Sequence, residues 1–340
     1  MDFKGKLFSY SGLKSINWRT RPNGLYCFNY HRIGDSNCAE FDPNVFSCTK
    51  DEFHLHLQFF KQHFTLISIE QLKTIIDSKQ SINKRYALIT FDDGYLDNYQ
   101  LAFPILKAEN VPAVFFIATD FIDQKVFPWW DETAWIIKHI DIDQQFVDFW
   151  QLPNEFLCAN ETEQIRQILL KLKIESDLSL QQKLIELNKF VKDSSVLEKR
   201  KRSLFMSWDM LREVEESGIT IGSQTCSHQV LSHLTESQQK TEILNSKQRL
   251  EQELQSPICC FAYPVGSEDS FNDITLDLLK SSDYTMAFTF VSGVNTKVSS
   301  SKYTLSRYSI DGNCDKRKIQ TQVAKNIFLE RLKSLSPFTK

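Results

Sequence analysis

Two adjacent carboxylates, Asp92 and Asp93, follow directly after an apolar run at residues 86–91, and Gly94 comes next. Like charges this close repel each other, so placing both carboxylates there is costly without a cation or a shared proton. One carboxylate could bind a metal ion while the other accepts a proton from water. The alternative interpretation is a plain Asp-Gly turn in which neither side chain has a chemical role.

Histidines follow two other apolar segments, at 25–30 and 219–222. His228 ends the stretch 222–228 (Gly-Ser-Gln-Thr-Cys-Ser-His), in which Gln224 lies four residues before it. An imidazole can bind a metal ion, whereas a glutamine amide oxygen is a poor ligand for zinc. His31 follows the apolar run at 25–30 and is equally compatible with proton transfer and with packing in the core.

A third segment, residues 261–266 (Phe-Ala-Tyr-Pro-Val-Gly), leads from an apolar run into a Pro/Gly turn. Such a turn holds backbone amides in a fixed place, as the stabilisation of a negatively charged oxygen requires. A simple turn without chemical function is the alternative interpretation.

The elements that must position these residues alternate along the chain, which indicates a mostly parallel sheet or barrel. We predict strands at 25–30, 64–69, 86–91, 112–118, 219–223, 259–263 and 285–291. We predict helices at 49–63, 69–78, 98–109, 236–254 and 273–281, and one more that begins after its cap, Ser207. The candidate residues then lie at the ends of parallel strands and face one mouth of a barrel. Carboxylates and imidazoles gathered there favour a metal-assisted hydrolase.

The domain organisation follows from where this alternation stops. Residues 123–202 are helical in pattern, polar and almost free of glycine, so we predict a helical insertion there. The barrel is expected at 23–122 and 203–312, with a C-terminal helix or tail at 313–340. An N-terminal arm at 1–22 is basic and aromatic. It either contacts a membrane surface or an anionic glycolipid, or is simply solvated.

Composition narrows the class of protein further. The formal net charge of the 340 residues is −3, which argues against a nucleic-acid partner bound through a broad basic surface. No apolar stretch approaches the ~18 residues that a membrane helix needs, and the first residues lack an apolar leader segment. The eight cysteines form no Cys-x-x-Cys pair. We therefore expect a cytoplasmic protein with reduced, buried thiols and no transmembrane segment.

These motifs, in this order, resemble those of the polysaccharide deacetylases of carbohydrate esterase family 4, which share the NodB homology domain. Residues 90–94 (Thr-Phe-Asp-Asp-Gly) match the first family motif, and 221–228 and 261–266 resemble the second and third. The resemblance implies an α/β fold: a distorted (β/α) barrel carrying the helical insertion. The position of His31 near the N-terminus resembles a subgroup in which the barrel is circularly permuted. This subgroup includes deacetylases of bacterial surface polysaccharides.

The resemblance also implies an activity, the hydrolysis of the acetyl group of an N-acetylated sugar in a polysaccharide, an oligosaccharide or a glycan precursor. The resemblance implies that Asp92 is the general base, His31 the general acid, and Tyr263 the backbone donor to the oxyanion. It also implies that a divalent metal is held by three ligands, Asp93, His228 and Gln224. Zinc is the implied metal, with cobalt or nickel as alternatives.

We expect four further residues to contact the substrate: Trp130, Asp131, Pro264 and Arg307. The tryptophan offers a flat face to a sugar ring, although packing of the insertion onto the barrel is the alternative. Because a cytoplasmic location is expected, the saccharide could be lipid-linked or nucleotide-linked, with peripheral contact to a lipid-linked glycan.

Gln224 stands where the family has a histidine, so we expect weaker zinc binding or a different preferred metal. This departure leaves open a catalytically impaired homologue that binds glycans. A deacylase for O-acetyl or formyl groups is a further alternative, because the same water and oxyanion donor serve any acyl group.

Overall fold

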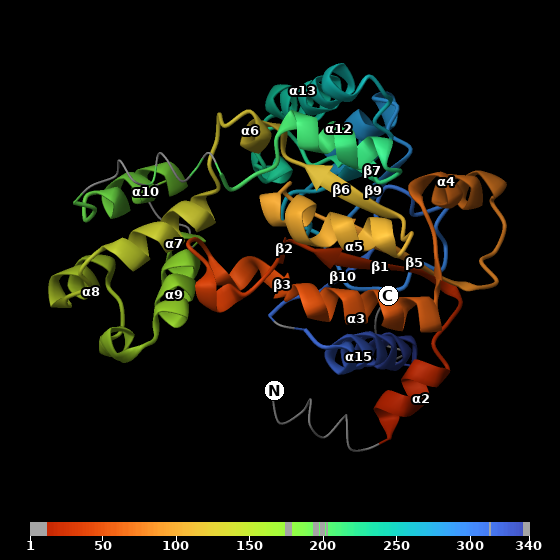
Figure 1. Cartoon of the computed structure of the whole chain (residues 1–340), viewed down its shortest axis with the longest axis horizontal. Coiled ribbons are helices and arrows are strands. Elements are labelled where there is room, and N and C mark those ends of the chain that lie inside the picture. Colours follow the sequence, from red (N-terminus) through yellow and green to blue (C-terminus); the bar gives the residue numbers. More distant parts are fainter. Residues whose placement is uncertain are drawn as a thin grey trace.

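A computed structural model of the chain shows a barrel surrounded by helices, with a separate group of helices at one side (Figure 1). The residues that the structure describes are 12–173, 179–192, 197, 201, 203–312 and 314–335.

The centre of the fold is a parallel sheet that curls into a nearly closed barrel (Figure 1). The strands follow the order β10-β1-β5-β6-β7-β8-β9, with β4 beside β5 and every pair parallel. Phe288 in β9 bridges Leu305, just before β10, and so brings the two ends of the sheet together. This arrangement confirms the predicted (β/α) barrel. The strands are β1 (Gly24–Tyr30), β4 (Thr65–Leu66), β5 (Arg85–Phe91), β6 (Ala113–Ile117), β7 (Thr220–Ser223), β8 (Cys260–Ala262), β9 (Met286–Phe288) and β10 (Arg307–Ser309).

The helices that cover the barrel follow the strands in sequence. They are α3 (Lys50–His63), α4 (Ile69–Ser78), α5 (Phe103–Ala108), α6 (Thr119–Ile122), α12 (Trp208–Glu216), α13 (Glu236–Leu254), α14 (Asp273–Ser281) and α15 (Lys316–Leu335). Shorter elements are η1 (Ser36–Cys38), η2 (Pro43–Val45), η3 (Asn98–Ala102) and η5 (Leu231–His233), and a small parallel pair β2 (Arg32–Ile33) and β3 (Phe46–Cys48).

Several helices begin at reciprocal caps that the sequence encodes. At the start of α3 the Thr49 hydroxyl accepts the Glu52 N–H, and the Glu52 carboxylate accepts the Thr49 N–H. Ser68 with Gln71 and Thr235 with Gln238 repeat this capping box at α4 and α13. These caps satisfy backbone donors that the first turn would otherwise leave unpaired, and so fix where each helix begins.

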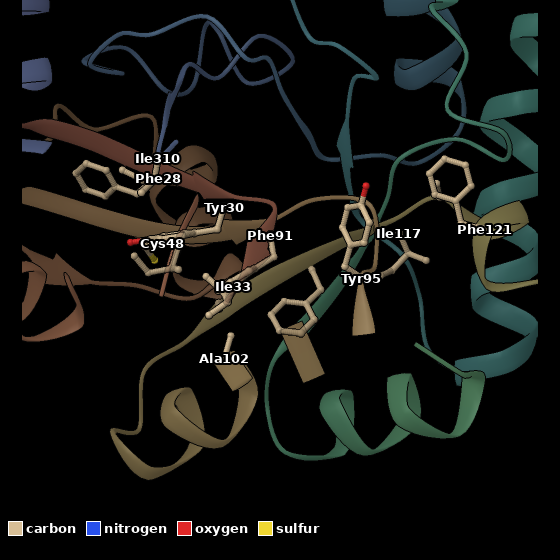
Figure 2. Close-up of a cluster of buried hydrophobic side chains, with 14 of the residues drawn as sticks. Phe28, Tyr30, Ile33, Cys48, Phe91, Tyr95, Ala102, Ile117, Phe121 and Ile310 are labelled. Carbon is tan, nitrogen blue, oxygen red and sulfur yellow. The ribbon is translucent and has the colours of Figure 1, made fainter. Parts of the chain in front are cut away.

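Aromatic side chains make up much of the core. The Phe28 ring of β1 stacks on Phe60 of α3, with centroids 4.2 Å apart. The Tyr30 and Phe91 rings, from the ends of β1 and β5, lie 5.3 Å apart. Figure 2 shows these strand residues together with Tyr95, from the segment that follows β5. This core therefore accounts in part for the large phenylalanine content, and its rings pack against the ends of β1 and β5.

Between β6 and α12, the described residues form helices and turns. The helices lie together beside the barrel (Figure 1) and contribute their own buried residues, including Phe146 and Ile165. They are α7 (Trp129–His139), α8 (Gln144–Trp150), η4 (Asn154–Cys158), α9 (Glu161–Lys173) and α10 (Leu180–Asn188).

The two ends of the described chain pack against each other. Helix α2 (Leu13–Arg19) lies beside α15, and Arg331 donates to the Asn17 side chain and to the Thr20 carbonyl. Trp18 is buried, and the Arg21 guanidinium lies 3.9 Å from its ring centre. The second half of the predicted arm is therefore part of the fold rather than a free arm, while residues 1–11 lie outside the described residues. None of the helices in the described ranges is long and apolar enough to span a bilayer.

Candidate active site

Asp92, the expected general base, forms an ion pair with a buried arginine of β10. Arg307 Nη1 and Nη2 donate to Asp92 Oδ1 and Oδ2 at 2.7 and 3.0 Å. Asn29 Nδ2 also donates to Oδ2, at 3.1 Å, and Arg307 Nε donates to the Thr289 carbonyl at 2.8 Å. The pairing of β10 with β1 and of β1 with β5 brings these residues together. Such a two-pronged ion pair fixes the plane of the carboxylate as well as its position.

Asp93 faces a different partner because the chain turns sharply after Asp92. Its backbone has a φ of 76°, a left-handed conformation rare for residues other than glycine. Asp93 Oδ1 lies 3.3 Å from His228 Nε2 and, among the described residues, makes no hydrogen bond although it is buried. Burial raises the pKa of the Asp93 carboxyl, and the neighbouring His228 and His31 oppose that increase.

Gln224 is locked by the backbone of Asp93. Its Oε1 accepts the Asp93 N–H at 2.8 Å, and its Nε2 lies 3.2 Å from His228 Nε2. Turning the amide over would set two N–H donors against each other, so this hydrogen bond determines which end faces His228. The amide therefore presents a donor, rather than a ligand oxygen, to the place where a cation would bind. This geometry argues against the expected role of Gln224 as a metal ligand.

The remaining donor pair does suit a divalent cation. Two ligands at about 2.0–2.1 Å from one tetrahedral zinc ion would be roughly 3.3 Å apart, which is the observed separation of Asp93 Oδ1 and His228 Nε2. A cation would also satisfy the buried Oδ1, which is otherwise costly to leave unpaired. Catalytic zinc sites usually have three protein ligands, and within the described ranges no three His, Cys, Asp or Glu side chains form such a group.

His31 stands at the end of β1, close to Asp92. Its Nε2 lies 4.0 Å from Asp92 Oδ2, and the imidazole is partly exposed. The backbone of His31 is anchored on both sides, because its N–H donates to Ser47 Oγ and its carbonyl accepts from Asn98 Nδ2. The ring edge approaches Phe290. The imidazole is thus positioned beside the site with access to solvent, as a proton donor would need.

At the turn after β8, the structure differs from the prediction that the Tyr263 N–H is the oxyanion donor. The Tyr263 N–H already donates to the Phe288 carbonyl at 3.1 Å as part of the sheet, so it is not free for a substrate. Pro264 is buried, and its carbonyl accepts the Gly266 N–H. Val265 lies at the exposed tip of the turn with a φ of 62°, and its N–H makes no hydrogen bond with the described residues. The free amide at this turn is therefore two residues further along than predicted.

Trp130 reaches the site from helix α7. Its ring lies edge-on to His228, with centroids 5.2 Å apart. The indole Nε1 donates to the Tyr95 hydroxyl, which in turn donates to Asp131 Oδ2, both at 2.8 Å. Asp131 Oδ1 accepts the Asp42 N–H. A buried hydrogen-bond chain thus joins the insertion to the loop after β5 and holds the ring beside His228.

Two of the expected substrate contacts are wrong. Asp131 and Arg307 are completely buried, so neither can touch a saccharide in this conformation. Asp131 accepts a hydrogen bond from the Tyr95 hydroxyl, and Arg307 donates to Asp92, so both polar groups bind partners inside the protein. Burial raises the pKa of Asp131 to about 7, and the nearby Arg32 opposes this shift. Reasoning from the sequence missed both roles, although Arg307 is the one charge in the run 304–310.

Comparison with known proteins identifies the family of the chain. A family model described as polysaccharide deacetylase matches residues 79–287, which is more than half of the chain. The chain belongs to the polysaccharide deacetylase family. The expected family is therefore confirmed.

Two curated relatives have informative names. The putative polysaccharide deacetylase YxkH of Bacillus subtilis is 21% identical over 278 residues, which cover 82% of this chain and 68% of that protein. The poly-beta-1,6-N-acetyl-D-glucosamine N-deacetylase of Staphylococcus aureus is 27% identical over 116 residues. That match covers 32% of this chain and 40% of the staphylococcal protein.

Solved structures share the fold at low sequence identity. The Streptococcus pyogenes deacetylase PplD, in complex with acetate, has a TM-score of 0.57 and 17% identity, covering 89% of this chain and 99% of that one. IcaB from Ammonifex degensii has a TM-score of 0.54 and 16% identity, covering 90% and 97%. These likenesses support the barrel architecture.

Proposed function

We propose that this polysaccharide deacetylase removes the acetyl group from an N-acetylated saccharide by hydrolysis. The observation that carries the proposal is the pair of aspartates at the end of β5. Arg307 and Asn29 orient Asp92, while Asp93 faces His228. One carboxylate is thereby fixed for proton transfer and the other for binding, which is the division of labour that hydrolysis requires.

The protein groups suggest a reaction in which water attacks the amide carbonyl carbon. Asp92 accepts a proton from the attacking water as the new C–O bond forms. The Val265 N–H is the free backbone donor for the oxygen that becomes negative. His31 then gives a proton to the nitrogen as the C–N bond breaks, so that acetate and a free amino sugar leave.

We further propose that Asp93 and His228 hold a divalent cation, with zinc, cobalt and nickel as the candidates. When bound, the cation would polarise the substrate carbonyl and lower the pKa of water. Two protein ligands imply weaker binding than the three of an ordinary catalytic zinc site.

The substrate class we propose is a saccharide that contains N-acetylhexosamine. The name of the staphylococcal relative supports β-1,6-linked N-acetylglucosamine oligomers as the first compounds to test. Trp130 is partly exposed beside His228 and is the candidate surface for a sugar ring. The eight free cysteines are compatible with our prediction of a cytoplasmic location, where a lipid-linked or nucleotide-linked precursor would be available.

Acetate release tests the proposal directly. The purified protein should release acetate from N-acetylglucosamine oligomers or from precursor sugars when Zn²⁺, Co²⁺ or Ni²⁺ is supplied. Asp92→Asn should abolish turnover, and a chelator should suppress it. No acetate from any substrate with any of these metals would refute the proposal, provided that the protein is folded. A parallel panel of O-acetylated and N-formylated sugars determines which acyl group is removed.

A second candidate function is glycan binding without turnover, and the hydrogen bonding of Gln224 favours it. Its Nε2 lies within hydrogen-bond distance of His228 Nε2, the atom that a cation would need. Saccharide binding by the metal-free protein, without acetate release after metals are added, would support this function over hydrolysis.

A further inference from the structure

The outer surface of α15 carries apolar side chains that the fold does not use. The inner side of this helix packs Ile319, Val323 and Ile327 into the core. At 3.6 residues per turn, Leu329 and Leu332 lie on the opposite side, and their side chains are 46% and 47% exposed. A surface helix normally has one apolar stripe. The two leucines therefore form a second apolar strip that nothing in the described structure covers.

This strip is surrounded by positive charge. Helices α2 and α15 together carry eight lysines and arginines and a single acid, Glu330, although the whole chain has a net charge of −3. Lys325 and Lys333 are exposed beside the two leucines. We call Lys325, Leu329, Leu332 and Lys333 the α15 outer face.

The adjoining helix α2 extends this character. Ile16 is 56% exposed and Arg19 is exposed one turn further along α2. Arg331 joins α15 to α2 through Asn17 and Thr20, so the two helices lie side by side (Figure 1). Exposed Ile16 and Arg19 thus add an apolar and a basic side chain on the helix that adjoins α15.

We propose that the α15 outer face docks the protein on a membrane that contains anionic lipids. Lysines beside exposed leucines match the two layers of such a surface, because phosphate groups attract the ammonium groups and the acyl boundary accepts the apolar tips. A nucleic acid would use the lysines, but it would leave the leucines without a role. The inference depends on this surface alone and holds whether or not the proposed hydrolysis is correct.

Vesicle sedimentation with the full chain tests the proposal. The probes are vesicles of phosphatidylcholine alone and vesicles in which about a third of the lipid is phosphatidylglycerol. The protein should sediment with the anionic vesicles at low salt and remain in solution with the neutral ones. Raising the salt should weaken binding, because exposed charges are screened over about 10 Å at 0.1 M.

Paired variants separate the two contributions. Leu329→Ser with Leu332→Ser, and separately Lys325→Glu with Lys333→Glu, should each lower vesicle affinity by at least about tenfold. Leu170→Ser is a matched control, because this leucine is 55% exposed on α9, away from the α15 outer face, and its loss should leave affinity unchanged. Circular dichroism and thermal unfolding confirm that each variant is folded.

Three results would overturn the proposal. The first is no binding to anionic vesicles at low salt. The second is loss of binding in the lysine variant but not in the leucine variant, which would reveal a surface for polyanions in general. The third is binding that depends on Lys4 and Lys6, tested with Lys4→Glu and Lys6→Glu, while the α15 variants bind normally.

Discussion

Arg307 and Asp92 form a fully buried, two-pronged ion pair at 2.7 and 3.0 Å, and no part of Arg307 is exposed. Strand β10 contributes the arginine and β5 leads to the aspartate, with β1 between them. The arginine is therefore a positioning residue that acts on the substrate only through Asp92.

Replacing Arg307 should lower kcat and leave KM nearly unchanged, because the side chain orients the base but never touches a saccharide. Arg307→Lys keeps a charge but loses the bidentate geometry, so we expect about a 10- to 100-fold loss of kcat. Arg307→Ala should also reduce the free energy of unfolding by about 3–5 kcal/mol, because it leaves a buried carboxylate unpaired. Steady-state kinetics and urea unfolding measure both effects. An increase confined to KM would contradict this role.

Gln224→His should increase the affinity for zinc, because an imidazole in place of the locked amide adds a third ligand to Asp93 and His228. Equilibrium dialysis followed by metal analysis should show at least about tenfold tighter binding than in the wild type. Gln229→His is the matched control, because it adds an exposed histidine five residues away without entering the site. Equal affinity in both variants would mean that the amide does not limit binding.

Local signals in the sequence predicted much of the scaffold. The expected helices at 69–78, 236–254 and 273–281 have the bounds of α4, α13 and α14, because each begins at a capping box that is readable from a few adjacent residues. Strand β10 was not predicted, because only three residues pair and they are not an apolar run. An element was predicted correctly where adjacent residues in the sequence determine it, and was missed where contacts with distant residues determine it.

The site was predictable to the extent that its motifs are local. Asp92, Asp93, Gln224, His228 and His31 meet as the family resemblance implied. Which backbone amide remains free at the turn after β8 depends on pairing between Tyr263 and Phe288, which no short motif reveals. The burial of Arg307 and Asp131 likewise results from contacts across the barrel and the insertion.

Tyr95→Phe should destabilise the protein and lower activity together. The hydroxyl accepts from Trp130 and donates to Asp131, so its removal takes a partner from the indole N–H and from the buried Asp131 Oδ2. We expect a loss of about 1–3 kcal/mol in the free energy of unfolding, and weaker saccharide binding as the Trp130 ring loses its support. Tyr99→Phe is the control, because its hydroxyl bonds to Glu213 at an exposed position and should matter little. Urea unfolding and binding titrations provide the test, and equal effects of both variants would contradict it.

Asp131 should make stability depend on pH between about 4 and 7. Burial raises its pKa in the folded protein to about 7, compared with an ordinary value of 3.8. The folded state therefore holds a proton that the unfolded state has released, so this group favours folding most at low pH. Its contribution declines as the pH rises above 3.8 and is lost above about 7, a change on the order of a few kcal/mol. Asp131→Asn cannot ionise, so its stability relative to the wild type should rise over that range. Urea unfolding at a series of pH values measures this difference, and a difference that does not change with pH would show that Asp131 titrates elsewhere.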